Sequence, residues 1–109
     1  MSAPRFGSLA QGPAAGPGAE SFAELAAAGG ARVERIASRA VRDGEWYQQP
    51  HAEFVLLVAG AARLGFADGS QASLAAGDWA VLPAGCRHRV AWTDPAQETL
   101  WLAVHLPPA

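Results

Sequence analysis

The sequence predicts an all-β protein, a small antiparallel barrel or sandwich of roughly eight short strands. From position 32 onward, apolar and polar residues mostly alternate, which places successive side chains on opposite faces of a strand. Asp68-Gly69 is a strong two-residue hairpin signal between two such segments. Twelve glycines and eight prolines among 109 residues also fit a turn-rich β fold better than a helical bundle.

The N-terminal region differs in composition from the rest of the chain. Residues 1–18 are rich in Ala, Gly and Pro, and three prolines interrupt any regular element, so we expect a flexible arm, extended or partly disordered, with contacts of Phe6 and Leu9 on the barrel as the alternative. Ser21 and Glu24 then have the spacing of a capping box. This pattern predicts a short helix over 19–30 that ends at Gly29-Gly30, with an alanine-rich linker as the alternative.

The remaining segments are assigned to strands from their alternation and from the turns between them. The segment 53–59 is dense in Phe, Val and Leu, as expected of a strand covered on both faces. The expected strands cover 32–38, 46–49, 53–59, 61–66, 71–74, 79–82, 87–92 and 99–105.

Length, charge and cysteine content exclude several classes of protein. A chain of 109 residues forms one domain with a single core. No apolar run is long enough to cross a membrane. We expect no secretory signal, because the N-terminal region lacks a basic segment followed by an apolar core. A net charge of −2 gives no basic surface for nucleic acid. One cysteine rules out an internal disulfide and fits the cytoplasm, where we expect the protein to reside.

The segment from Gly77 to His88 is the most informative part of the chain. A Gly-Asp pair predicts a turn, 79–82 a strand, and a Pro-Ala-Gly corner a second turn before the strand that carries His88. The spacing Gly-x5-Pro-x-Gly-x2-His resembles the second motif of the cupin family. In that family the motif histidine points into a small β-barrel and is usually a metal ligand. The resemblance therefore implies a cupin barrel, a double-stranded β-helix or jelly roll, over 31–109.

The first cupin motif is present only in part. Its final Glu-x6-Gly fits Glu53 and Gly60. The two histidines that normally precede the glutamate are absent in both registers, and their positions are taken by Tyr47 and Gln49 or by Trp46 and Gln48. The resemblance covers about residues 31–106. Within the family, the chain is similar to small single-domain bacterial cupins of the cupin 2 conserved barrel type, which have no assigned reaction.

Another histidine can replace the missing pair. His51 lies two positions before Glu53, so both side chains leave the same face of an extended strand. Since the resemblance implies that Glu53 and His88 face the lumen, the three residues His51, Glu53 and His88 form the expected metal site. Two imidazoles and a carboxylate suit one divalent transition metal, such as Zn, Fe, Mn or Ni, and leave positions open for water and substrate.

Each candidate also has a purely structural interpretation. His88 can hydrogen-bond to a carbonyl or to Glu53, and His51 can be a solvated loop residue. His105 can face either the lumen or solvent. Cys86 reads as a small hydrophobic residue, because no orienting third group accompanies it. The carboxylate of Glu53 can instead form an ion pair inside the barrel mouth with Arg63, Arg87 or Arg89.

Three further residues are expected in a substrate pocket. Gln49 is a candidate hydrogen-bonding partner for a substrate, and Tyr47 and Trp92 are expected to line the mouth of a small pocket. Trp92 shares a strand face with His88 if the strand is regular. It stands where the second cupin motif ends in asparagine, so we expect a narrower and more apolar lumen that suits compact molecules better than large polar sugars.

Two classes of function remain open at this point. The first is a metal-dependent cupin enzyme, an isomerase, dioxygenase or lyase acting on a compact organic substrate. The second is a non-catalytic, metal-poor cupin that binds or senses a small molecule, since one fold hosts both. Apolar residues on both faces of several strands also predict self-association, and the resemblance implies a homodimer.

Overall fold

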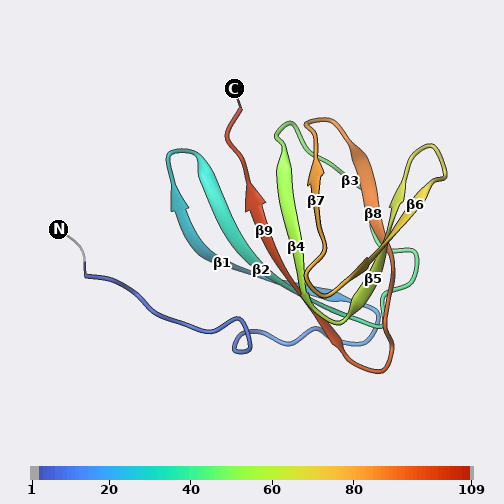
Figure 1. The fold of residues 1–109 in the computed structure, drawn as a ribbon, viewed down its shortest axis with the longest axis horizontal. Helices are drawn as coiled ribbons and strands as arrows, with labels where there is room; N and C mark the ends of the chain where they lie inside the picture. The colour runs from blue at the N-terminus through green and yellow to red at the C-terminus, as the bar shows by residue number, and fades with distance from the viewer. Residues whose placement is uncertain (1–2, 109) are drawn as a thin grey trace.

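Two antiparallel sheets face each other and form the body of the molecule (Figure 1). The structure, a computed structural model, describes residues 3–108. The larger sheet has the order β1-β2-β9-β4-β7, with strands Glu20–Ala28, Ala31–Arg39, Glu98–His105, Glu53–Ala59 and Trp79–Leu82. The smaller sheet has the order β3-β8-β5-β6, with strands Tyr47–Gln48, Arg87–Thr93, Ala61–Phe66 and Gln71–Ala75.

The core lies between the sheets because one face of each strand points inward. Along β9, every second residue from Thr99 to His105 is buried and the residues between are partly exposed, which is the two-residue period of a strand with one covered face. The same alternation in β4 buries Val55 and Leu57. The all-β prediction and the predicted jelly-roll architecture are confirmed. Among residues 3–108 no helix is long and apolar enough to span a membrane.

The helix predicted over 19–30 is wrong, because this segment forms strand β1. It pairs with β2 from Glu20, opposite Ser38, to Ala28, opposite Ala31. Gly29 and Gly30 form the two-residue hairpin loop, and both have the positive φ that a type I′ turn requires, 60° and 82°. The backbone hydrogen bonds between β1 and β2 therefore outweigh the local preference of this segment for a helix.

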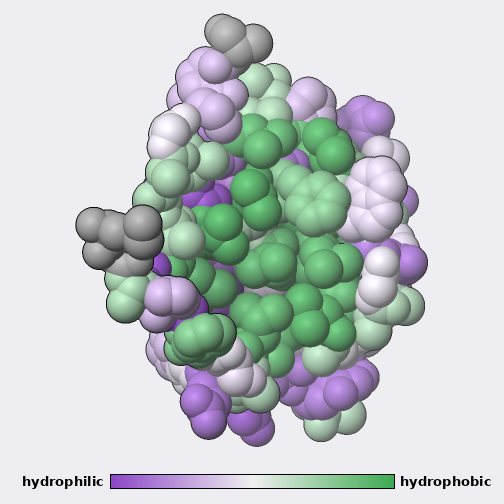
Figure 2. Space-filling model, turned by 60° about the vertical axis from the view of Figure 1, so that its left-hand side comes forward, coloured by the Kyte–Doolittle hydropathy of each residue, from purple (hydrophilic) through white to green (hydrophobic). Residues whose placement is uncertain are grey.

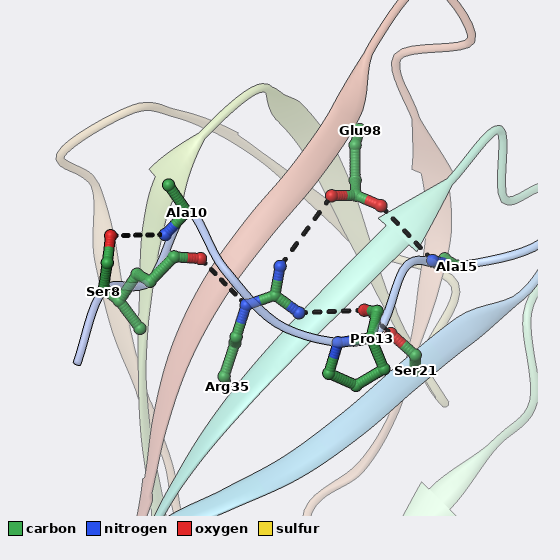
Figure 3. Close-up of polar contacts among 8 residues, drawn as sticks. Ser8, Ala10, Pro13, Ala15, Ser21, Arg35 and Glu98 are labelled. Carbon is green, nitrogen blue, oxygen red and sulfur yellow. Dashed lines mark hydrogen bonds and ion pairs between the residues drawn. The ribbon is translucent and has the colours of Figure 1, made fainter.

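Arg35 attaches part of the N-terminal arm to the barrel (Figure 3). The Arg35 guanidinium donates to the carbonyl oxygens of Leu9 at 2.8 Å and Pro13 at 2.9 Å, and lies 3.9 Å from the Glu98 carboxylate. The Ala15 amide donates to Glu98. Arg35 is only 2% exposed, and a buried guanidinium needs such acceptors.

Replacing Arg35 with methionine should release the arm. The variant loses two charge-assisted hydrogen bonds and an ion pair, so we expect a decrease of about 1–3 kcal/mol in the free energy of unfolding. We also expect faster cleavage within the arm by a non-specific protease, measured by urea unfolding and by mass spectrometry of the fragments. Arg39→Met, an exposed change on the same strand, is the control. Equal cleavage in both variants would contradict this role.

Candidate functional site

A cavity of about 70 Å³ lies between the two sheets. It is lined by aliphatic and aromatic side chains, among them Phe22, Val90 and Trp101. Seven polar residues also line it: Glu20, Glu34, Tyr47, Gln49, Glu53, His88 and His105. The cavity therefore combines an apolar wall with several hydrogen-bonding groups, as ligand sites do.

The strand register brings Glu53 and His88 to this cavity. Glu53 begins β4 and pairs with Leu82 of β7 and with His105 of β9. His88 lies on β8 opposite Tyr47 of β3. Both ionisable groups are buried, with 7% exposure for Glu53 and 9% for His88. The sequence motif thus delivers the His88 ring to the same cavity as the carboxylate.

The Glu53 carboxylate and the His88 ring face each other without a direct hydrogen bond. His88 Nδ1 lies 3.1 Å from the carbonyl oxygen of Cys86, so Nδ1 carries the hydrogen that this acceptor needs. In the neutral ring, Nε2 then keeps a lone pair. Nε2 lies 3.8 Å from Oε1 of Glu53, which exceeds hydrogen-bond length. The gap leaves both atoms available to a third group.

His51 and His105 form a separate hydrogen-bonded chain with Glu34. His105 Nε2 donates to Glu34 Oε1 at 3.0 Å. His105 Nδ1 then accepts from His51 Nε2 at 2.9 Å, and the two rings meet edge to face. Of the two environments considered for His105, the structure shows the lumen.

The expected metal ligands do not converge. Within residues 3–108, no group of three or more His, Cys, Asp or Glu side chains is arranged to hold an ion. His51, the expected third ligand, is bonded to His105 instead. Three donors at about 2.0–2.2 Å from one point are required, so these side chains do not fit a metal in this arrangement. Ligation by His51, Glu53 and His88 stays a prediction, and no chemical step is derived through an ion.

The arginines proposed as partners of Glu53 lie elsewhere. Arg63 stacks over the Trp92 ring at 4.7 Å. Arg87 and Arg89 both stack over Trp46 at 4.5 Å. None of the three lines the cavity. The buried carboxylate of Glu53 therefore has imidazoles, rather than a guanidinium, as its neighbours.

The pocket residues predicted from sequence divide into two groups. Tyr47 and Gln49 line the cavity, and the side-chain oxygen of Gln49 is buried without a hydrogen-bond partner. Trp92 does not line it. The reason is a β-bulge in β8: Arg63 pairs with Trp92 but Leu64 pairs with Val90, so the side-chain alternation shifts by one residue. Trp92 is thereby turned away from the lumen.

Two cavity carboxylates were not identified from the sequence. Glu34 precedes Ile36 by two positions on β2, so the period-two pattern contains the signal for its inward position. Glu20 was assigned to the region of the incorrect helix, which hid its place on β1. Glu20 accepts a hydrogen bond of 2.6 Å from Ser38, which in turn accepts one from the Trp101 indole.

Burial shifts the protonation of several cavity groups. It raises the pKa of Glu53, and the nearby His105 and His88 oppose this increase. It also raises the pKa of Glu20, against the hydrogen bond from Ser38. The pKa of Tyr47 rises because of burial and the neighbouring carboxylates, Glu20 first among them. All three directions indicate a lumen that disfavours negative charge.

Comparison with known proteins identifies the family. A model of the cupin domain matches residues 34–105. The chain belongs to the cupin family. No curated protein sequence matches this cupin.

Solved structures confirm the fold. The cupin is 41% identical to a candidate mannose-6-phosphate isomerase from Ralstonia eutropha JMP134, with 96% of this chain and 100% of that chain covered and a TM-score of 0.82. A cupin superfamily protein from Desulfitobacterium hafniense DCB-2 is 18% identical, with coverage of 86% and 83% and a TM-score of 0.65. The EutQ protein of Clostridium difficile is 13% identical, with coverage of 82% and 68% and a TM-score of 0.70.

Removing the charge of Glu53 should change how stability depends on pH. The folded protein holds the pKa of Glu53 above its unfolded value, so ionisation costs stability as the pH rises from about 4 through the folded pKa. Glu53→Gln lacks this cost. We expect its free energy of unfolding to increase relative to wild type between about pH 4 and pH 7, measured by urea unfolding. Glu24→Gln, on the exposed part of β1, should show the same pH dependence of unfolding free energy as wild type. If the pH dependence of Glu53→Gln were also the same as that of wild type, the raised pKa of Glu53 would be contradicted.

Proposed function

We propose that this cupin binds a compact organic molecule in the lumen, in contact with Gln49, Glu53 and His88. The observation that carries the proposal is the buried side-chain oxygen of Gln49, which has no partner in the protein. Leaving such an atom unbonded costs about 1–3 kcal/mol, and a bound ligand removes this cost. The 3.8 Å gap between His88 and Glu53 offers a second position for a ligand group.

The size of the cavity limits the ligand. A cavity needs roughly 10–15 Å³ to hold one water molecule. A volume of about 70 Å³ therefore holds on the order of five groups the size of a water molecule. The apolar wall suits a short hydrocarbon portion. These dimensions support the sequence-based expectation of a compact substrate.

The name of the Ralstonia relative suggests a sugar phosphate, but the lumen offers little support for that ligand here. A phosphate group is recognised by Arg, Lys or clustered amide donors. The charged residues that line this cavity are three glutamates, without Arg or Lys among its described lining residues. We therefore base the proposal on the lining of the cavity.

We also propose that ligand binding does not require a metal ion. The support is the arrangement of the potential metal ligands. His51 is hydrogen-bonded to His105, so only His88 and Glu53 face each other, without a third ligand. A metal-dependent isomerase, dioxygenase or lyase remains the alternative that the family resemblance implies. Elemental analysis of protein purified without a nickel column distinguishes the two.

A second copy of the chain is the proposed partner, bound at the outer face of the larger sheet. Figure 2 shows hydrophobic side chains gathered in a broad patch on this side. Apart from Glu98 at the start of β9, the outward positions of β9, β4 and β7 are apolar: Leu100, Leu102, Val104, Phe54, Leu56, Val58, Trp79 and Val81. Trp79 is 63% and Val81 53% exposed. A continuous apolar face marks an interaction site, and two identical flat faces can cover each other about a two-fold axis.

Filling the lumen should abolish ligand binding. Val90→Phe places a larger ring in the cavity, so thermal shifts caused by compact amines, alcohols, amides or carboxylates should be lost. Ser73→Phe, at an exposed position of β6, should retain them, and removal of metals with EDTA should leave the wild-type shifts unchanged. Because Val90→Phe can itself unfold the protein, contacts from bound probe to Trp101 in NMR spectra provide a second measurement. Absence of cavity-dependent binding for every probe would refute the function.

A charge on the outer face should prevent dimerisation. For wild type we expect twice the mass of one chain by light scattering, and for Val81→Lys the mass of one chain, since two lysines would be buried at the interface. Gln71→Lys, exposed on the smaller sheet, is the control and should remain dimeric. A monomeric wild type would contradict the proposed interface.

A further inference from the structure

We infer that the lumen selects a small organic ammonium ion, whose N–H groups donate to Gln49, Glu53 and His88. This inference rests on the proposed binding function and adds the chemical class of the ligand. It follows from three features of the cavity: the sign of its charges, the kind of hydrogen-bonding atoms that are free, and its apolar wall.

Three carboxyl groups line the cavity, and its described lining includes no Arg or Lys. Glu20, Glu34 and Glu53 contribute carboxylates from three strands, β1, β2 and β4. The basic side chains nearest in sequence to His88, Arg87 and Arg89, stack on Trp46 outside the lumen. A cavity with carboxylates and low exposure to water attracts a cation and repels carboxylate and phosphate ligands.

Three acceptor atoms at the cavity have no hydrogen-bond partner among the described residues, beside the Tyr47 hydroxyl, which can donate or accept. The Gln49 side-chain oxygen is buried and unbonded. His88 Nε2 keeps a lone pair because Nδ1 donates to the Cys86 carbonyl. Glu53 Oε1 lies 3.8 Å from that nitrogen, with no direct bond between them. Three acceptors around one cavity need a donor with several hydrogens, and a primary ammonium supplies three N–H groups.

The wall of the cavity accommodates the rest of such a ligand. Phe22, Tyr47 and Trp101 supply aromatic surface, and Ile36 and Leu64 supply aliphatic surface. Aromatic faces also attract cations when water is excluded. A short alkyl chain with a terminal ammonium therefore matches both the polar and the apolar parts of the lumen.

Three probes of similar shape test the charge class: n-butylammonium, 1-butanol and butyrate, titrated near neutral pH into the full-length protein and followed by calorimetry or NMR. We expect n-butylammonium to bind at least tenfold more tightly than 1-butanol, and butyrate to show no binding. Glu53→Gln should weaken the binding of n-butylammonium at least tenfold and change the affinity for 1-butanol by less than threefold. Gln49→Glu should strengthen the binding of n-butylammonium, because it replaces an amide acceptor with a charged acceptor. Glu24→Gln, outside the cavity, should change neither.

The possible outcomes separate this inference from the function on which it rests. Tighter binding of 1-butanol or butyrate, at a site that Val90→Phe blocks, would overturn the ammonium class but leave lumen binding intact. Loss of n-butylammonium binding after treatment with EDTA would overturn it in favour of a metal-bound ligand. Weaker n-butylammonium binding in Gln49→Glu would show that Gln49 donates, which also contradicts the acceptor arrangement. If Glu53→Gln fails to fold, Glu20→Gln tests the same charge dependence.

Discussion

The site depends on a buried carboxylate and a buried imidazole that face each other without bonding. The registers of β4 with β7 and β9 fix Glu53, and the pairing of β8 with β3 fixes His88. The Cys86 carbonyl oxygen accepts a hydrogen bond from His88 Nδ1. The other ring nitrogen, Nε2, lies 3.8 Å from the Glu53 carboxylate. Two acceptors in a low-dielectric cavity repel each other unless a donor lies between them. This arrangement of the backbone supports the proposed position of a ligand between the two groups.

The sequence predicted the fold well because its strongest signals are local and repeat regularly. The turn–strand–turn segment that ends at His88 and the alternation in β4 and β9 indicate both the architecture and the inward position of Glu53. β1 was missed because a capping pattern and alanines favour a helix locally, whereas pairing with β2 is a long-range effect. Trp92 was misplaced because a bulge changes the alternation without leaving a signal in the sequence. The bond between His51 and His105 joins residues 54 positions apart, beyond the reach of local patterns.

The two faces of one strand serve different purposes in this cupin. On β4, Glu53, Val55 and Leu57 face inward, while the residues between them face outward and are apolar. A sheet that needed only a monomeric core would carry polar residues on its outer face. The arm and Arg35 cover the outer side of β2, and the arm reaches Glu98 at the start of β9, whereas Trp79 and Val81 of β7 are exposed. The apolar patch is thereby limited to the centre and one edge of the sheet, and the lumen lies on the opposite face from the proposed interface.

Similarity of fold and identity of ligand have separate physical origins here. An identity of 41% over nearly the whole chain accompanies a shared fold, and one fold can carry different ligand sites. Ligand choice depends on a few side chains at the open positions of the lumen, and a single change there alters charge without altering the fold. In this chain those positions carry carboxylates, an imidazole and an amide oxygen. Because a carboxylate cannot stabilise a phosphate, the lining of the cavity is a better guide to the ligand than the name of a relative.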